Sequence, residues 1–168
     1  MTPQPPTWLS IDPAKSSGVA RWHGTQLAET LIVKPRGGKG KWYAGAAIHE
    51  SRIEAWDAVY EGVRAVVIER GFGGMAAAVR SQGMHIGWHQ RECAGRNMPD
   101  PIEINVSEWR RVIKEMMGVS FPRDSKRCKA LSVQLACRQY GRSFGEDEAD
   151  AVLLGLAAMR MGLVEGAL

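Results

Sequence analysis

The alternation of apolar and polar positions predicts strands in the first part of the chain. Three short apolar runs, at residues 7–11, 18–22 and 26–33, are separated by the turn segments PAKSS and HGT. Runs of this length between such turns predict an antiparallel meander of three strands. A fourth run, RAVVIE at 64–69, is rich in β-branched residues and predicts a buried strand.

Helical spacing of apolar positions dominates the remainder. Helices are predicted over 42–61, 75–92, 108–117, 123–140 and 146–164, and a fifth strand over 101–106. Ser107 is the expected N-cap of the third helix. This order predicts one α/β domain over residues 1–168, with a mixed five-stranded sheet of three antiparallel strands and then two parallel ones, flanked by helices. Residues 1–6, polar and proline-rich, are expected to be a disordered lead.

Two acidic residues stand where two of these strands end. Asp12 follows the first apolar run, and Glu69 ends the fourth. A right-handed helical crossover places the fourth strand parallel to another strand, most economically the first. Ligand sites in open α/β sheets lie outside the carboxyl ends of such strands. We therefore expect Asp12 and Glu69 to meet at one edge of the sheet.

The last helix brings further acids. Asp147 and Asp150 are three residues apart, hence on one helix face, and an apolar segment that must be buried follows them. Clusters of oxygen ligands without histidine suit hard cations such as Mg²⁺ or Mn²⁺. Two such ions about 4 Å apart can support phosphodiester hydrolysis. Each acid also has a simpler interpretation: a turn cap before Pro13, an ion pair for Glu69, or complements to the helix dipole.

Charge is unevenly distributed. The chain has 22 basic and 18 acidic residues, a net charge of +4, but residues 107–142 alone carry nine basic and three acidic residues, a net +6. Residues 34–41 add four basic residues and no acid. A concentrated basic segment is typical of a polyanion partner, usually nucleic acid, although a solvated helix face has the same composition.

Three motifs carry a family resemblance. SIDPAKSSGVA after the first strand, VVIERGF at the fourth and DEADAVLLGLA opening the last helix resemble those of RuvC-type Holliday junction resolvases, in the RNase H-like nuclease superfamily. The resemblance in element order covers nearly the whole chain. It implies an RNase H-like fold and a structure-selective DNA endonuclease that resolves four-way junctions by paired symmetric nicks.

The resemblance also assigns roles by position. Asp12, Glu69, Asp147 and Asp150 correspond to the acids that bind two Mg²⁺ (or Mn²⁺) ions. Phe72 corresponds to an aromatic residue that contacts unstacked bases, and Lys126 best matches a basic residue that supports catalysis, with Lys114 and Lys129 as alternatives. The expected phosphate contacts of the junction arms lie in the two basic segments: Lys39, Lys41, Lys114, Arg123, Lys126, Arg127 and Lys129.

The expected assembly is a C₂ homodimer with two active sites on a nearly two-fold symmetric junction. The segment AVRSQGMHIGW resembles the helix near the dimer interface of these proteins. Ala14 stands where cellular members usually have glycine, and Glu146 and Glu148 are extra acids, so Glu148 competes with Asp147 as third ligand. These features resemble the phage-encoded branch, for which a broader branched-DNA specificity (Y-forks or flaps) is an alternative.

Two other classes of protein share parts of this pattern. An actin- or sugar-kinase-like ATPase needs a duplicated fold and a second glycine-rich phosphate motif, neither of which the sequence shows, so no nucleotide cofactor is expected. A non-catalytic RNase H-like nucleic-acid-binding module would not need acids at all three motifs. The pair His85 and His89 lacks the glutamate of a zincin motif, which favours a surface or core role.

Composition sets the expected compartment. Three cysteines without a CxxC motif indicate a reducing environment, and the longest apolar run, at 151–159, is too short to cross a membrane. We expect a cytoplasmic protein without a secretory signal, located in the host bacterial cytoplasm if it is phage-encoded.

Overall fold

The computed structural model describes residues 5–14, 16–34, 53–71 and 76–165. Its strands are β1 (Thr7–Asp12), β2 (Ser17–His23), β3 (Gln26–Val33), β4 (Val63–Arg70) and β5 (Ile102–Asn105). Its helices are α2 (Ile53–Tyr60), α3 (Ala76–Gly95), α4 (Val106–Met117), α5 (Ser125–Tyr140) and α6 (Glu146–Arg160). No helix within these residues has the length and apolar character needed to cross a bilayer.

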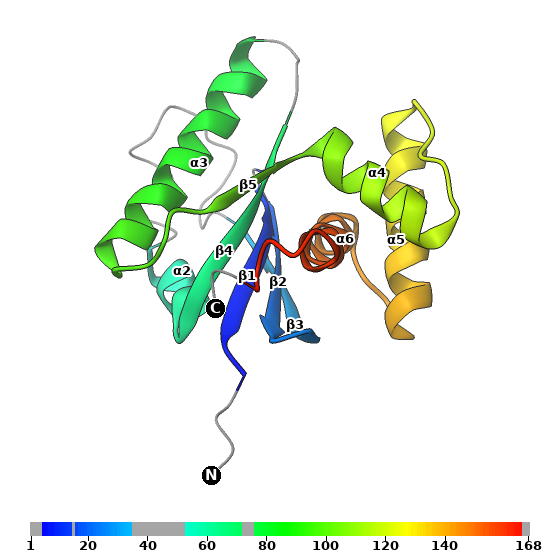
Figure 1. Ribbon diagram of the computed structural model, residues 1–168. Helices are drawn as coiled ribbons and strands as arrows, with labels where there is room; N and C mark the ends of the chain where they lie inside the picture. The colour runs from blue at the N-terminus through cyan, green and yellow to red at the C-terminus, as the bar shows by residue number, and fades with distance from the viewer. Residues whose placement is uncertain (1–4, 15, 35–52, 72–75, 166–168) are drawn as a thin grey trace.

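The five strands form one mixed sheet, in the order β3-β2-β1-β4-β5. β1 pairs antiparallel with β2 and parallel with β4, and β4 pairs parallel with β5. The predicted mixed sheet, with three antiparallel strands followed by two parallel ones, is therefore confirmed. Figure 1 shows the sheet in the middle of the molecule, with α2 and α3 on one side and α4, α5 and α6 on the other.

Each face of the sheet has its own apolar core because successive side chains of a strand point to opposite faces. Trp8 and Trp22 pack with Trp109 and the apolar residues of α6 in one cluster. Leu9 and Ile11 pack with residues of α2 and α3 in the other. Trp8, Trp22, Trp56 and Trp109 are almost completely buried in these cores.

A buried chain of hydrogen bonds holds α6 on the sheet. The Trp22 indole N–H donates to Ser10 Oγ over 2.9 Å, and the Ser10 hydroxyl donates to the Ala151 carbonyl over 2.7 Å. A Cβ at Gly155 would lie 2.4 Å from the Trp22 ring, so this glycine allows the close approach of the helix. The first turn of α6 is thereby fixed relative to the ends of β1 and β2.

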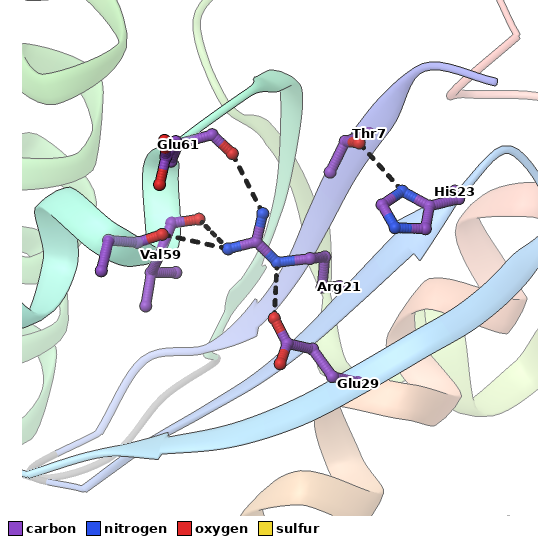
Figure 2. A network of polar contacts seen from close by, with 7 residues as sticks. Thr7, Arg21, His23, Glu29, Val59 and Glu61 are labelled. Carbon is purple, nitrogen blue, oxygen red and sulfur yellow. Dashed lines mark hydrogen bonds and ion pairs between the residues drawn. The ribbon is translucent and has the colours of Figure 1, made fainter. Parts of the chain in front are cut away.

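Arg21 of β2 anchors α2 on the other face. Its guanidinium donates to the carbonyl oxygens of Val59 (2.8 Å) and Glu61 (3.0 Å), at the carboxyl end of α2. Its Nε also lies 2.8 Å from a carboxylate oxygen of Glu29 on β3. Figure 2 shows this network, in which a cation meets the negative end of the helix dipole.

Several predicted boundaries differ from the structure. Ser107 is not the N-cap of α4: the helix starts at Val106 with Asn105 as its cap, because β5 already ends there. β4 runs one residue past Glu69, and the last helix ends at Arg160 and not at residue 164. The part of the predicted helix 42–61 before Ile53 lies outside the described residues, as does the lead up to residue 4.

Candidate active site

Asp12 and Glu69 lie at the carboxyl ends of neighbouring parallel strands. Ile11 of β1 pairs with Ile68 of β4, and the two acids are the next residues along the chain. The charge of Glu69 adds to burial in raising the pKa of Asp12, as expected for acids on adjacent strand ends. The predicted meeting of these two residues at one edge of the sheet is therefore confirmed, and it results from the crossover connection.

Gly18 lets the last helix reach this edge. It is the register partner of Asp12 across β1 and β2. A Cβ at Gly18 would lie 1.9 Å from the backbone carbonyl oxygen of Asp147, far inside the contact distance of real atoms. The first turn of α6 therefore packs directly on the backbone of β2, which brings Asp147 and Asp150 toward Asp12.

Burial and mutual repulsion make these acids resist ionisation. Burial raises the pKa of Asp12 well above its usual value, and the nearby charges of Glu69 and Asp150 raise it further. Burial also raises the pKa values of Glu69 and Asp150. Such shifts indicate carboxylates that the protein alone does not neutralise.

Lys129 of α5 is the lysine in contact with the acids. Its ammonium lies 2.7 Å from Asp147 Oδ1. Burial by itself lowers the pKa of Lys129, but the hydrogen bond and charge of Asp147, with the charges of Asp150 and Asp12, raise it above its usual value. Lys126, which the sequence favoured for this position, lies three residues earlier on α5 and is exposed.

Glu148 has a structural role. One of its carboxylate oxygens accepts from the Thr30 hydroxyl over 2.8 Å, and the other accepts from the backbone N–H of Gly145 over 2.8 Å. Both oxygens are thus engaged in fixing the start of α6 against β3. Of the two candidates for the third acid, Asp147 is therefore the one whose carboxylate faces the cluster, as its contact with Lys129 and its influence on Asp12 show.

Sequence reasoning missed Trp109 and Arg110, on the first turns of α4. The indole N–H of Trp109 donates to Glu69 Oε2 over 2.8 Å. The Arg110 guanidinium lies 5.2 Å from the centre of the Trp109 ring and 5.4 Å from that of Phe121. The positive charge of Arg110 lowers the pKa values of Glu69 and Asp150, partly offsetting their burial. No spacing in the sequence indicates these contacts, because they depend on how α4 is rotated about its axis.

Asp150 has a buried oxygen without a partner. The residue is 5% exposed, and its Oδ1 makes no hydrogen bond within the described part of the chain. The buried hydroxyl of Ser132 on α5 lies near this carboxylate and lowers its pKa, but this hydroxyl also makes no hydrogen bond of normal geometry within the described residues. An orphaned buried carboxylate oxygen is costly unless a ligand satisfies it.

The donor set fits a hard divalent cation. All four acids offer oxygen, three have pKa values raised by burial, and Asp150 Oδ1 lacks a partner. These are the ligands that Mg²⁺ and Mn²⁺ prefer. The described residues do not, however, hold three acidic, histidine or cysteine side chains already gathered around one point. Asp147 contacts the Lys129 ammonium through Oδ1.

The other predicted site residues fall into two groups. Lys114 on α4, and Arg123, Lys126 and Arg127 at or just before the start of α5, are exposed and available to a polyanion. Phe72, Lys39 and Lys41 lie outside the described residues.

His85 and His89 are buried on α3, in agreement with a core role. The Tyr60 hydroxyl lies 2.7 Å from His89 Nδ1, and the His89 ring packs edge-on against Trp56 and Trp88. The two histidines belong to the core between α2, α3 and the sheet.

Comparison with models of known protein families gives no match, and comparison with curated protein sequences gives none either. Solved structures do match. The structure of Thermus thermophilus RuvC in complex with Holliday junction substrate is 15% identical, with 93% of this chain and 96% of that chain covered, at a TM-score of 0.66. A second Thermus thermophilus RuvC structure is 14% identical over the same shares, at a TM-score of 0.65. The chain therefore has the mixed five-stranded, RNase H-like fold of RuvC.

Proposed function

We propose that the protein is a metal-dependent, structure-selective DNA endonuclease that resolves Holliday junctions by paired symmetric nicks. The observation that supports this proposal is the placement of Asp12 and Glu69 at the carboxyl ends of neighbouring parallel strands, against which the start of α6 packs with Asp147 and Asp150. Asp150 Oδ1 is buried there and has no partner within the described residues. The RuvC fold supports it, since one of the matching RuvC structures is bound to a Holliday junction.

The four acids would hold two divalent cations, Mg²⁺ or Mn²⁺. When bound, the cations supply Lewis-acid stabilisation of the phosphate oxygens and lower the pKa of water. Asp12 and Glu69 are fixed by the strands, and Asp150 by the buried start of α6. Their rigidity keeps the ligands in place without reorganisation during the reaction.

Lys129 replaces Lys126 as our candidate for the basic residue of the site. Its ammonium already lies among the acids, where it partly compensates their charge. With Asp147 serving as a cation ligand, the Lys129 ammonium would be available to donate to a phosphate oxygen of the scissile strand and to stabilise the charge that develops there.

The exposed basic residues of α4 and α5 would hold the junction arms. Lys114, Arg123, Lys126 and Arg127 contact backbone phosphates in this proposal, which gives binding that is largely independent of sequence and sensitive to salt. A homodimer would present two such sites to the two-fold symmetric junction. A monomeric mass of the protein–junction complex in analytical ultracentrifugation would overturn the dimer.

The decisive experiment is a cleavage assay on a labelled immobile four-way junction with Mg²⁺, Mn²⁺ or EDTA. Linear duplex, Y-fork and flap substrates run beside it, and Asp12→Asn runs in parallel. Paired symmetric nicks that disappear with EDTA or with the variant establish the resolvase. Equal cleavage of forks and flaps would establish a broader branched-DNA endonuclease. Tight junction binding without any cleavage would indicate a non-catalytic binding module and overturn the proposal.

A matched pair of variants distinguishes the roles of Lys126 and Lys129, the two lysines of α5. We expect Lys129→Met to lower the cleavage rate of bound junction by about 10²-fold, as for loss of a charged group that stabilises the transition state. Lys126→Met removes the same charge from the exposed position of the same helix, and we expect it to weaken junction binding only. Single-turnover cleavage at saturating protein measures the difference. The reverse result would return the role to Lys126.

A further inference from the structure

We propose that Trp109 is a positioning residue that holds Glu69 through one carboxylate oxygen, so that Glu69 binds a divalent cation through the other oxygen alone. This inference rests on the proposed function, which it deepens. Its observation is the 2.8 Å hydrogen bond from the Trp109 indole N–H to Glu69 Oε2.

The position of Trp109 follows directly from the sheet. Glu69 pairs with Ile104 of β5, and α4 begins two residues later at Val106. The backbone N–H of Asn105 donates to a carboxylate oxygen of Glu108 over 3.0 Å, which fixes the first turn of the helix. Trp109 is therefore held beside Glu69 by a short, hydrogen-bonded connection and not by a long loop.

Packing leaves the indole little freedom. Trp109 is 0% exposed, and its ring meets Phe121 edge to face, with ring centres 5.7 Å apart. The Arg110 guanidinium lies near both rings. Because an indole ring carries one donor and no acceptor, a ring fixed in this way can present only an N–H to the carboxylate.

The bond has two consequences for Glu69. It orients the carboxylate, as partners of metal ligands commonly do. It also occupies Oε2, and so disfavours a bidentate grip on one ion by both oxygens. A carboxylate that binds through one oxygen would occupy one coordination position of an ion instead of two. The remaining positions would be open to the phosphate and to water, which Mg²⁺ tends to retain.

The test compares Trp109→Phe with Trp8→Phe in the full chain. Trp8 is an equally buried tryptophan whose indole N–H also makes a 2.8 Å bond, to the Gly24 carbonyl, near the start of β1. Both variants therefore lose one ring and one hydrogen bond, but only the first loses a bond to a carboxylate of the site. Isothermal titration with MnCl₂, without DNA, is the main measurement.

We expect Trp109→Phe to bind Mn²⁺ about tenfold more weakly than the unaltered protein, the lower end of the range for loss of a partner of a metal ligand. Trp8→Phe should bind Mn²⁺ as the unaltered protein does. In cleavage assays Trp109→Phe should lower the turnover of bound junction and leave junction affinity unchanged. Equal Mn²⁺ affinity of the two variants would overturn the inference, as would an unaltered protein that binds no Mn²⁺.

A second measurement needs no tryptophan replacement that risks misfolding. In a ¹⁵N-labelled sample, Mn²⁺ should broaden the Trp109 indole N–H resonance at the lowest concentrations and spare that of Trp8. Glu69→Gln, which keeps a hydrogen-bond acceptor but removes the charge, should shift the Trp109 resonance in the metal-free protein. An unmoved Trp109 resonance in both experiments would overturn the inference. A failure to cleave junctions by the unaltered protein would overturn the proposed function and leave this result standing.

Discussion

The two ends of the sheet carry polar clusters of opposite character. Near the start of β1, Arg21 is surrounded by acceptors: the carbonyls at the end of α2 and the carboxylate of Glu29. Near the end of β1, burial raises the pKa values of Asp12, Glu69 and Asp150. The nearby Lys129 forms its ion pair with a different acid, Asp147. One cluster is satisfied by the protein itself, and the other is not.

The two clusters differ in whether their polar groups stabilise the fold or serve a function. A half-buried cation with good acceptors fixes an element of the fold, as Arg21 fixes α2. A cluster of buried acids with too little positive charge lowers stability, and folds retain such a cluster where a ligand or a reaction needs it. We therefore expect substitutions at the Arg21 end to change stability and substitutions at the acid end to change activity.

The largest expected effect is that of Asp12→Asn on activity. Loss of this proposed cation ligand should lower the cleavage rate by about 10³-fold, since cation stabilisation of the reacting phosphate is worth several kcal/mol. The fold should be retained, because asparagine has nearly the same shape and removes one of the repelling charges. Single-turnover cleavage and thermal melting measure the two effects. Unchanged cleavage would show that the acid end is structural like the Arg21 end.

Gly18→Ala tests the approach that creates the acid cluster. The added methyl group would overlap the Asp147 carbonyl, so α6 or β2 must move. We expect the free energy of unfolding to fall by about 3 kcal/mol and cleavage to fall with it. Gly87→Ala is the matched control, because this exposed helical glycine has nothing within 4 Å of its added Cβ. Urea denaturation measures the stability of both variants. Equal stability of the Gly18→Ala and Gly87→Ala variants would contradict the close approach of α6 to β2.

Arg21→Ala tests the satisfied cluster. It leaves the carbonyls of Val59 and Glu61 without their donor, and we expect a loss of about 2 kcal/mol in the free energy of unfolding, as for bonds from charged groups. Arg21→Lys keeps the charge without the planar donor group and should recover only part of the loss. Cleavage per folded molecule should be unchanged in both variants. A large loss of cleavage at full stability would contradict the separation.

The smallest expected effect is a pH dependence of stability in EDTA. An acid whose pKa is raised on folding keeps its proton in the native state after the unfolded state has lost it, so the free energy of unfolding falls as the pH rises above about 4. Asp12→Asn removes this cost. Its stability advantage over the unaltered protein should therefore be small at pH 4 and grow as the pH rises.

Urea denaturation at several pH values measures this dependence. Saturating Mg²⁺ should abolish the difference by stabilising the charged acids of the unaltered protein. An advantage that stays constant with pH would contradict the raised pKa of Asp12.

The sequence predicts the frame of the site better than its contacts. The position of Asp12 and Glu69 follows from strand order and the crossover rule, both of which act over whole elements. The contacts of Trp109 with Glu69 and of Lys129 with Asp147 depend on helix rotation by a fraction of a turn. A difference of three residues along α5 is therefore enough to make Lys126 the better match from the sequence, although Lys129 makes the contact. Ser107 was mistaken for a cap because a four-residue strand ends at Asn105, and strand ends have weak sequence signals.

The attachment of α6 also has a consequence for biosynthesis. The Ser10 hydroxyl and the Ala151 carbonyl that it contacts are 141 residues apart in the chain, and α6 packs on β1, β2, β3 and β4. During translation the first strands emerge long before their covering helix, and Asp12 emerges long before Asp147 and Asp150. A nascent chain on the ribosome thus carries only two of the four acids of the cluster. The complete cluster forms late in folding, when α6 packs on the sheet.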